Sequence, residues 1–183
     1  DDDFVDCNDP SLDEINQIKI KAENGDAEAQ WEIANYYWDE DDSDKMIETI
    51  KWINLSAKNG HPRAQYILGC FYRLGDYVRE DKEEAFKYYS KSAGQGNLQA
   101  ITALGLCYKY GDGVEKDEPL AFELYKKAAE LGDELAMCNL GYCFEKGTGC
   151  LEDEEEAFYW YKKSAEAGNS RAMCNLGVCC QYE

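Results

Sequence analysis

The chain has 183 residues, of which 44% are hydrophobic and 13% aromatic, so it holds enough apolar material for one or two folded domains and is not a disordered tail. Its 38 acidic residues outnumber its 19 basic ones, and the formal net charge is -19. This charge disfavours nucleic acid and anionic membrane surfaces as partners, because binding to either depends on lysine and arginine.

The acidic first segment, residues 1–11, shows no targeting signal. Asp1-Asp2-Asp3 has neither the positive end nor the apolar run of a signal peptide. No later stretch approaches the roughly 20 apolar residues of a membrane span. We therefore expect no membrane insertion and a cytoplasmic location.

A glycine recurs at intervals of 35 or 36 residues along the rest of the chain: Gly25, Gly60, Gly96, Gly132 and Gly168. A polar residue follows each glycine, and an alanine follows three positions later. This order is typical of a helix that stops at a left-handed glycine and of a next helix that begins at a polar N-cap. The period predicts a repeat protein.

In chain order we expect the acidic segment, half a repeat that holds only a second helix, four full repeats and the first helix of one more. Their ranges are 1–11, 12–25, 26–60, 61–96, 97–132, 133–168 and 169–183. Because the last unit stops after one helix, we expect the natural protein to continue beyond Glu183.

The first helix of each repeat carries an apolar stripe at offsets 0, +4, +7 and +8 from the alanine. Four of these helices have Leu-Gly at +4 and +5, as in Leu104-Gly105. The glycine indicates that another helix approaches closely.

A loop and a second helix complete the repeat. Three loops are rich in glycine, as in 111–114, whereas the acidic loop 39–44 of the first full repeat lacks the Gly-x-Gly pattern. An N-cap aspartate, such as Asp117, opens a second helix whose stripe includes Ala121, Phe122 and Tyr125. Because one hairpin cannot bury both stripes alone, neighbouring hairpins are expected to stack.

The repeat from Ala136 to Gly168 closely resembles the Sel1-like repeat, and the resemblance covers residues 12–183. It implies an all-α fold, a right-handed α/α superhelix (solenoid) of helix-turn-helix repeats related to tetratricopeptide arrays. It also implies an adaptor or scaffold role.

The chain has nine cysteines, and several of them stand at recurring offsets. Three lie at offset +7, where we expect them to pack in the core as small hydrophobes: Cys107, Cys143 and Cys179. Three others fall on the opposite face and are candidates for accessible thiols: Cys70, Cys138 and Cys174.

A cysteine-rich branch of the Sel1-like family joins the two helices of each repeat by a disulfide. Cys138 and Cys174 resemble one half of that pattern, but Ala129 and Ala165 occupy the partner position. We therefore expect these bridges to be absent and the thiols to be reduced, as is usual in cytosol.

We expect neither a catalytic site nor a metal site, and we expect no cofactor. His61 is the only histidine and stands at an N-cap position. The glycine loops lack the Gly-Lys-Ser/Thr of a phosphate-binding loop, and a zinc site needs converging ligands. No nucleophile is paired with a base.

In the family geometry, the first helices line the concave side, and offsets -1, +2, +6, +9 and +10 project away from the core stripe. The partner-binding residues expected on this face are Trp31, Asn35, Trp38, Arg63, Tyr66, Arg73, Thr102, Leu106, Lys109, Tyr110, Tyr142 and Lys146. Tryptophan, tyrosine and arginine often anchor interfaces, and a basic stripe in an acidic chain attracts acidic ligands. The alternative that Tyr66 and Tyr142 only pack between neighbouring first helices stays open.

The main hypothesis is a non-catalytic scaffold that binds a protein or peptide, acidic or aromatic, on the concave face. The acidic start, residues 1–9, has the composition that such a groove would accept. One alternative comes from the resemblance to the cysteine-rich branch, which implies binding or hydrolysis of β-lactam-like small molecules. The chain would then be a disulfide-poor relative of those proteins. Another is a structural segment attached to a signalling domain such as a kinase. The sequence leaves the oligomeric state open.

Overall fold

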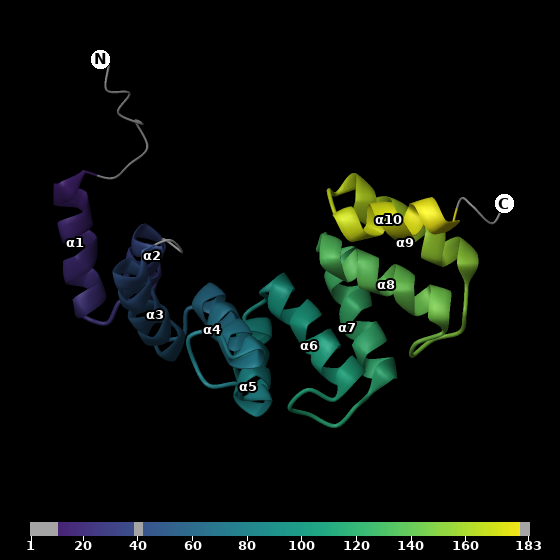
Figure 1. Ribbon diagram of the computed structural model, residues 1–183, viewed down its shortest axis with the longest axis horizontal. Coiled ribbons are helices and arrows are strands. Elements are labelled where there is room, and N and C mark those ends of the chain that lie inside the picture. The colour runs from purple at the N-terminus through teal and green to yellow at the C-terminus, as the bar shows by residue number, and fades with distance from the viewer. Residues whose placement is uncertain (1–10, 39–41, 180–183) are drawn as a thin grey trace, which may run out of the picture. The chain divides into compact units, whose positions relative to one another are not determined.

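The computed structural model describes residues 11–38 and 42–179, with side chains described as far as residue 176. These residues form ten helices and no strand (Figure 1), which confirms the all-helical fold. Residues 1–9, proposed above as a groove-binding segment, lie outside the described residues. The helices are α1 (Leu12–Glu23), α2 (Ala27–Tyr37), α3 (Ser43–Lys58), α4 (Pro62–Leu74), α5 (Lys82–Gly94), α6 (Leu98–Tyr110), α7 (Glu118–Glu130), α8 (Glu134–Lys146), α9 (Glu154–Glu166) and α10 (Ser170–Cys179).

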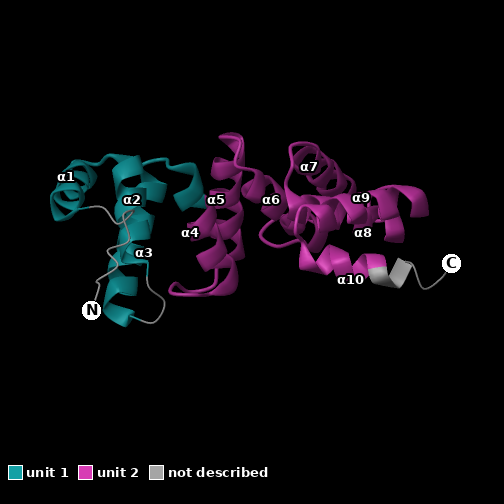
Figure 2. Ribbon diagram, turned by 90° about the horizontal axis from the view of Figure 1, so that it is seen from above, with its two compact units in different colours: residues 1–65 teal, residues 66–183 magenta. Residues whose placement is uncertain are grey.

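The chain divides into two compact units, residues 1–65 and residues 66–183 (Figure 2). In the first unit, α2 packs against both α1 and α3. In the second unit, α6 packs against α5 and α7, α8 packs against α7 and α9, and α10 packs against α9. Within each unit, the helices of these pairs follow one another in sequence and are neighbours in space, as expected of stacked hairpins.

The first helices begin where the sequence predicts. In each repeat, the N-cap side chain accepts a hydrogen bond from the backbone N–H of the alanine three positions later. These pairs are Asp26 with Ala29, His61 with Ala64, Asn97 with Ala100, Asp133 with Ala136, and Asn169 with Ala172.

The second helices are capped by aspartates that accept from the backbone N–H three residues on: Asp81, Asp117 and Asp153. The glutamates at the capping-box positions bind other groups. Glu84 pairs with Lys87 at 2.6 Å, and Glu156 accepts from the indole N–H of Trp160 at 3.0 Å. The side chains of these glutamates thus stabilise the outer face of the helix.

Several glycines have a positive φ, and the space around them differs. The glycines that end the second helices, such as Gly132 (φ +100), have no atom within 4 Å of an added Cβ. By contrast, a Cβ on Gly113 would overlap the carbonyl of Lys82, and one on Gly149 would overlap that of Glu118. Each of these two loops therefore lies against the start of the preceding second helix. The equivalent residue of the 75–81 loop is Tyr77, which also has a left-handed φ of 61.

The core of the second unit contains three tyrosines, each fully buried: Tyr89, Tyr125 and Tyr161. Each ring lies against the glycine of a Leu-Gly pair. A Cβ added to Gly69, Gly105 or Gly141 would approach a ring atom of these tyrosines to 2.7, 2.5 or 2.8 Å, respectively. The glycine thus makes room for a tyrosine of the second helix, which is the close approach that the sequence indicated.

In the first unit, different residues occupy the positions of the glycine and the tyrosine. Ala34 stands where the other repeats have the glycine, and Ile53 stands where they have the tyrosine. Both side chains are fully buried. A larger residue on the first helix is thus matched by a smaller one on the second, as close packing requires.

Candidate functional site

The side chains at offset +2 contact the start of the next first helix. The ring of Trp31 stacks on His61 with a centroid distance of 5.2 Å. Thr102 is only 1% exposed, and its hydroxyl donates to Asp133 at 2.9 Å. Thr102 is therefore buried against the neighbouring repeat, which contradicts its expected place on the open face. Trp31 stays partly exposed, and its role in binding a partner stays a prediction.

Cys138 occupies the same offset and is also buried, so the expectation of an accessible thiol was wrong for this residue. Its Sγ accepts from Nε of Arg171 at 3.3 Å, again across consecutive repeats. Of the other two candidates, Cys174 is exposed and Cys70 is half-buried.

The cysteines expected in the core behave as predicted where the structure describes them. Cys107 and Cys143 are buried. Burial raises the pKa of the Cys107 thiol to about 11 and that of Cys143 to about 12. The side chain of Cys179 lies outside the described residues. Cys107 and Cys143 are therefore protonated and unreactive near neutral pH.

In the first unit, the remaining predicted face residues are solvent-accessible. Asn35 and Arg63 are exposed, and Trp38, the C-cap of α2, is 36% exposed.

In the second unit, the residues at offsets -1, +6, +9 and +10 make up the surface that we call the first-helix face. Arg73 lies in it, with its Nε donating to the hydroxyl of Tyr89 at 3.3 Å. Tyr66 is half-buried, with its ring centroid 6.0 Å from that of Tyr89. Burial is the largest single influence on the pKa of the Arg73 guanidinium and lowers it. The hydrogen bond to Tyr89, together with the charge interactions with Tyr89, Cys70 and Cys107, outweighs burial, so the pKa is raised.

The middle of the first-helix face is built around Lys109. Its Nζ lies 3.8 Å from the ring centroid of Tyr142 and 5.4 Å from that of Tyr110. Tyr110 is 63% exposed, and Leu106 is half-buried beside the core. A cation over two aromatic rings offers a bound partner a charged contact and an apolar contact at the same position.

The far end of this face carries a carboxylate. Glu145 accepts from the hydroxyl of Tyr161 at 2.6 Å and from Nζ of Lys146 at 2.7 Å. Burial raises the pKa of Glu145, but these two hydrogen bonds outweigh burial and leave the pKa below its usual value. Lys146 is thus neutralised locally, unlike Lys109.

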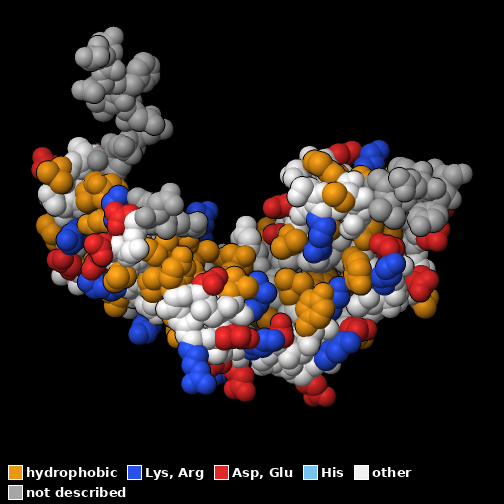
Figure 3. All heavy atoms as spheres, viewed as in Figure 1, with side chains coloured by type: hydrophobic (Ala, Val, Ile, Leu, Met, Phe, Trp, Pro, Cys, Tyr) orange, Lys and Arg blue, Asp and Glu red, His pale blue; other side chains and the backbone are white. Residues whose placement is uncertain are grey.

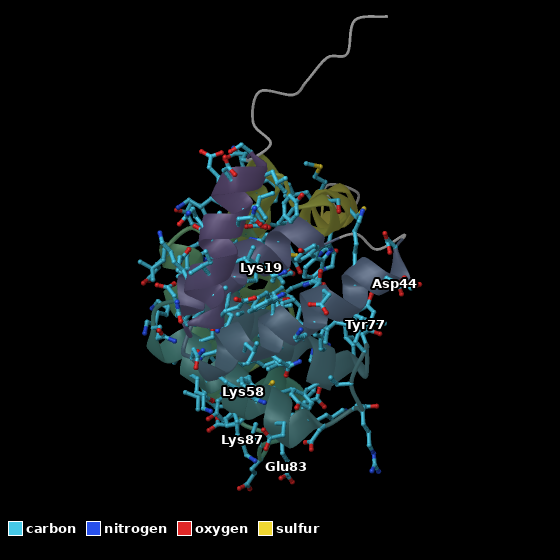
Figure 4. All side chains as sticks on the ribbon, turned by 90° about the vertical axis from the view of Figure 1, so that its left-hand side faces the viewer. Lys19, Asp44, Lys58, Tyr77, Glu83 and Lys87 are labelled. Carbon is cyan, nitrogen blue, oxygen red and sulfur yellow. The ribbon has the colours of Figure 1, made fainter. Side chains whose placement is uncertain are left out.

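The cations of the second unit fall into two groups. Lys82 pairs with Asp112, Lys87 with Glu84, and Lys116 with Glu118, as Lys146 does with Glu145. Lys91 and Lys163 lie over aromatic rings, as Lys109 does. Figure 4 shows Lys87 and Glu83 projecting outward from α5.

Arg73, Lys109 and Arg171 instead contact neutral groups, and none of them has an ion pair with an acid in the described part of the chain. In Figure 3, hydrophobic side chains with lysines and arginines among them lie over α6 and α8. Three cations of the first-helix face are therefore without an ion pair among the described residues of an acidic chain.

Two features went unnoticed in the sequence, where Tyr125 and Trp52 are only large residues of second helices. The hydroxyl of Tyr125 and the indole N–H of Trp52 are buried without a hydrogen-bond partner among the described residues. In the first unit, Trp52 also lines an open hollow of about 730 Å³ together with Tyr37 and Leu55. The sequence held one sign of the unpartnered Tyr125 hydroxyl. The residue at offset +9, which binds the equivalent hydroxyl in other repeats, changes from repeat to repeat.

No group of three or more histidine, cysteine or acidic side chains is placed to hold a metal ion within the described ranges. Among the described helices, none is long and apolar enough to cross a membrane.

Comparison with known sequences identifies the repeat. The sequence model of the Sel1 repeat matches residues 27–61, 62–97, 98–133, 135–169 and 170–183. The chain belongs to the Sel1 repeat family. Sel1 repeats generally mediate protein–protein interactions as scaffolds. No curated protein sequence matches the chain.

Solved Sel1-repeat structures resemble the chain. A protective antigen of uropathogenic Escherichia coli with an SLR fold is 33% identical, with a TM-score of 0.80 over 90% of this chain and 35% of its own. A Sel1 repeat protein from Oxalobacter formigenes is 34% identical, with a TM-score of 0.77 over 87% of this chain and 66% of its own. Cysteine-rich protein B of Helicobacter pylori is 25% identical, with a TM-score of 0.57 over 72% of this chain and 97% of its own. The chain thus spans about a third of the length of the E. coli antigen.

Proposed function

We propose that the chain is a non-catalytic scaffold that binds an acidic segment of a partner protein on the first-helix face of its second unit. The observation that carries the proposal is the absence of acidic partners for Arg73, Lys109 and Arg171 among the described residues of a chain whose net charge is -19. Cations left unpaired in such a chain attract carboxylates and repel basic partners.

The aromatic side chains of the same face supply the second part of an interface. Tyr110 is exposed and Tyr142 is half-buried beneath Lys109. A partner segment that lies over these rings excludes water and strengthens its contacts with the lysine. Acidic residues next to an apolar or aromatic one are therefore the partner sequence that this face fits best.

Charge reversal at Lys109 tests the proposal. A partner is first captured with the chain and identified, and its affinity is then measured over a series of salt concentrations. We expect Lys109→Glu to weaken binding by about 1.5–3 kcal/mol and salt to weaken binding to the wild type. Lys126→Glu is the matched control, because Lys126 is exposed on α7, outside this face. Equal affinities for wild type, Lys109→Glu and Lys126→Glu would place recognition elsewhere.

We also propose a reducing, cytoplasmic location. The support is chemical, since Ala129 and Ala165 stand where disulfide partners of Cys138 and Cys174 are found in the cysteine-rich branch. The buried Cys138 is bound to Arg171 in the described structure.

A further inference from the structure

Three tyrosines occupy equivalent positions on successive second helices, and their hydroxyls have different surroundings. The hydroxyl of Tyr161 donates to the carboxylate of Glu145 at 2.6 Å. The hydroxyl of Tyr89 accepts from Nε of Arg73 at 3.3 Å. The hydroxyl of Tyr125 is buried and has no hydrogen-bond partner within the described residues. Of these three tyrosine hydroxyls, only that of Tyr125 thus makes no hydrogen bond among the described residues.

The residue at offset +9 of the first helix accounts for the difference. It is Arg73 in one repeat and Glu145 in another, and each binds the tyrosine of its own repeat. In the middle repeat it is Lys109, whose Nζ lies instead over the ring of Tyr142 at 3.8 Å. The hydroxyl of Tyr125 therefore lacks the group that satisfies its counterparts, and an unmade bond to a buried hydroxyl is unfavourable.

The last complete repeat shows which group fits between such donors. The Glu145 carboxylate lies between the hydroxyl of Tyr161 and Nζ of Lys146, at 2.6 and 2.7 Å. In the middle repeat, Tyr125 and Lys109 supply the same two kinds of donor without a carboxylate. We infer that Tyr125 and Lys109 form a binding site for a carboxylate of the partner. This inference rests on the proposed function and names the group that the first-helix face recognises.

The surroundings of Tyr125 keep its hydroxyl protonated and able to donate a hydrogen bond. Burial raises the pKa of Tyr125, so its hydroxyl remains a protonated donor, and the nearby Arg171 guanidinium opposes part of that rise. Arg171 itself donates to Sγ of Cys138 and to the side-chain oxygen of Asn139, two neutral groups. The Tyr125 hydroxyl is shielded from water in the free chain.

The free protein provides the first test. Tyr125→Phe removes a hydroxyl that has no partner, so thermal unfolding should occur at the same or a higher temperature. Tyr161→Phe is the matched control, and it should lower the unfolding temperature because its hydroxyl binds Glu145. A loss of stability in Tyr125→Phe as large as that in Tyr161→Phe would show that the Tyr125 hydroxyl already has a partner, and the inference would be wrong.

A second variant supplies the missing carboxylate from within the chain. Lys109→Glu should accept from Tyr125 as Glu145 does from Tyr161, and should raise the unfolding temperature. The same substitution in a Tyr125→Phe background should give no such rise. An equal change in both backgrounds would show that residue 109 and the hydroxyl do not interact.

Binding is tested on the full chain with three N-acetylated peptides. Ac-Gly-Phe-Asp-Gly-NH2 carries a side-chain carboxylate, Ac-Gly-Phe-Asn-Gly-OH carries a terminal one, and Ac-Gly-Phe-Asn-Gly-NH2 carries none. We expect at least one acidic peptide to bind the wild type, and to bind Tyr125→Phe about tenfold more weakly. The neutral peptide should show no such difference. Equal binding of all three peptides, no binding by either acidic one, or no effect of Tyr125→Phe would each overturn the inference.

The captured partner separates this inference from the proposed function. If Lys109→Glu weakens partner binding and Tyr125→Phe does not, the first-helix face is the binding surface but the carboxylate does not contact Tyr125. If neither variant changes the affinity, the proposed function fails as well.

Discussion

The contact between Gly105 and Tyr125 makes a quantitative prediction about stability. A Cβ on Gly105 would lie 2.5, 2.8 and 3.0 Å from three ring atoms of Tyr125. Carbon atoms in contact are ordinarily about 3.5–4.0 Å apart, so the ring or the helix must shift by about 1 Å. Tyr125 is fully buried, and a close-packed core leaves no space for that shift.

We expect Gly105→Ala to lower the free energy of unfolding by about 1–2 kcal/mol. Overpacking of a core costs about 1–3 kcal/mol, and the better helix propensity of alanine offsets up to about 1 kcal/mol of this cost. Gly94→Ala is the matched control, because Gly94 is also helical but has no atom within 4 Å of its added Cβ. That control should be neutral or stabilising by up to about 1 kcal/mol.

Urea denaturation of both variants, followed by circular dichroism, measures the difference. The double variant Gly105→Ala/Tyr125→Ile reproduces the pair that the first unit uses, Ala34 and Ile53. In the Tyr125→Ile background, Gly105→Ala should no longer destabilise, so the double-mutant cycle should give a favourable coupling energy. A gain of stability in Gly105→Ala equal to that in Gly94→Ala would refute the close contact.

Three further predictions concern the loops, the links between repeats and the thiols. Gly113→Ala should cost at least about 1 kcal/mol more than Gly132→Ala in urea denaturation, since both strain φ but only the first overlaps the carbonyl of Lys82. Thr102→Val should destabilise by about 1 kcal/mol and Thr102→Ser by less, because only serine retains a hydroxyl for Asp133. Titration of the unreduced, denatured chain with a thiol reagent should find most of the nine cysteines free; a minority of free thiols would contradict the reducing location.

Much of the fold was predictable because local sequence signals mark where the helices of each repeat begin and end. A polar cap, an alanine three residues later and a left-handed glycine are local signals, and the hydrogen bond between Asn97 and Ala100 forms within a single helical turn. The Leu-Gly pair likewise indicated a close approach. What it did not indicate was the partner, since Tyr125 lies 20 residues beyond Gly105 and was interpreted as one member of an apolar stripe.

The candidate site was less predictable, because a helical stripe separates the inside of a hairpin from its outside and says nothing about the next hairpin. Offset +2 is outside its own hairpin and yet faces the N-cap of the next one, which is why Trp31 contacts His61 and Thr102 contacts Asp133. Lys109, at offset +9, also contacts the next repeat, because its Nζ lies over the ring of Tyr142, and this position required coordinates. The role of Lys109 in binding a partner stays a prediction.

The buried histidine gives a last prediction, on pH. Nδ1 of His61 accepts from the backbone N–H of Ala64 at 3.2 Å, and Nε2 lies 3.1 Å from the carboxylate of Glu28, so the neutral ring carries its proton on Nε2. Burial lowers the pKa of His61; Glu28 opposes this effect and Arg63 adds to it.

Because the folded pKa lies below the unfolded value of about 6.5, the unfolded chain takes up the proton first as the pH falls. The stability that neutral His61 contributes is therefore complete above about pH 6.5 and is lost as the pH falls toward the folded pKa. A proton on Nδ1 also removes the N-cap hydrogen bond, which is typically worth about 1 kcal/mol. His61→Asn keeps a cap of the kind that Asn97 provides, and it does not titrate. Urea denaturation at about pH 7.5 and about pH 5.5 should show a larger loss of stability in the wild type than in His61→Asn. Equal losses would mean that the acid sensitivity comes from the carboxylates and that His61 is protonated as easily in the folded chain as in the unfolded one.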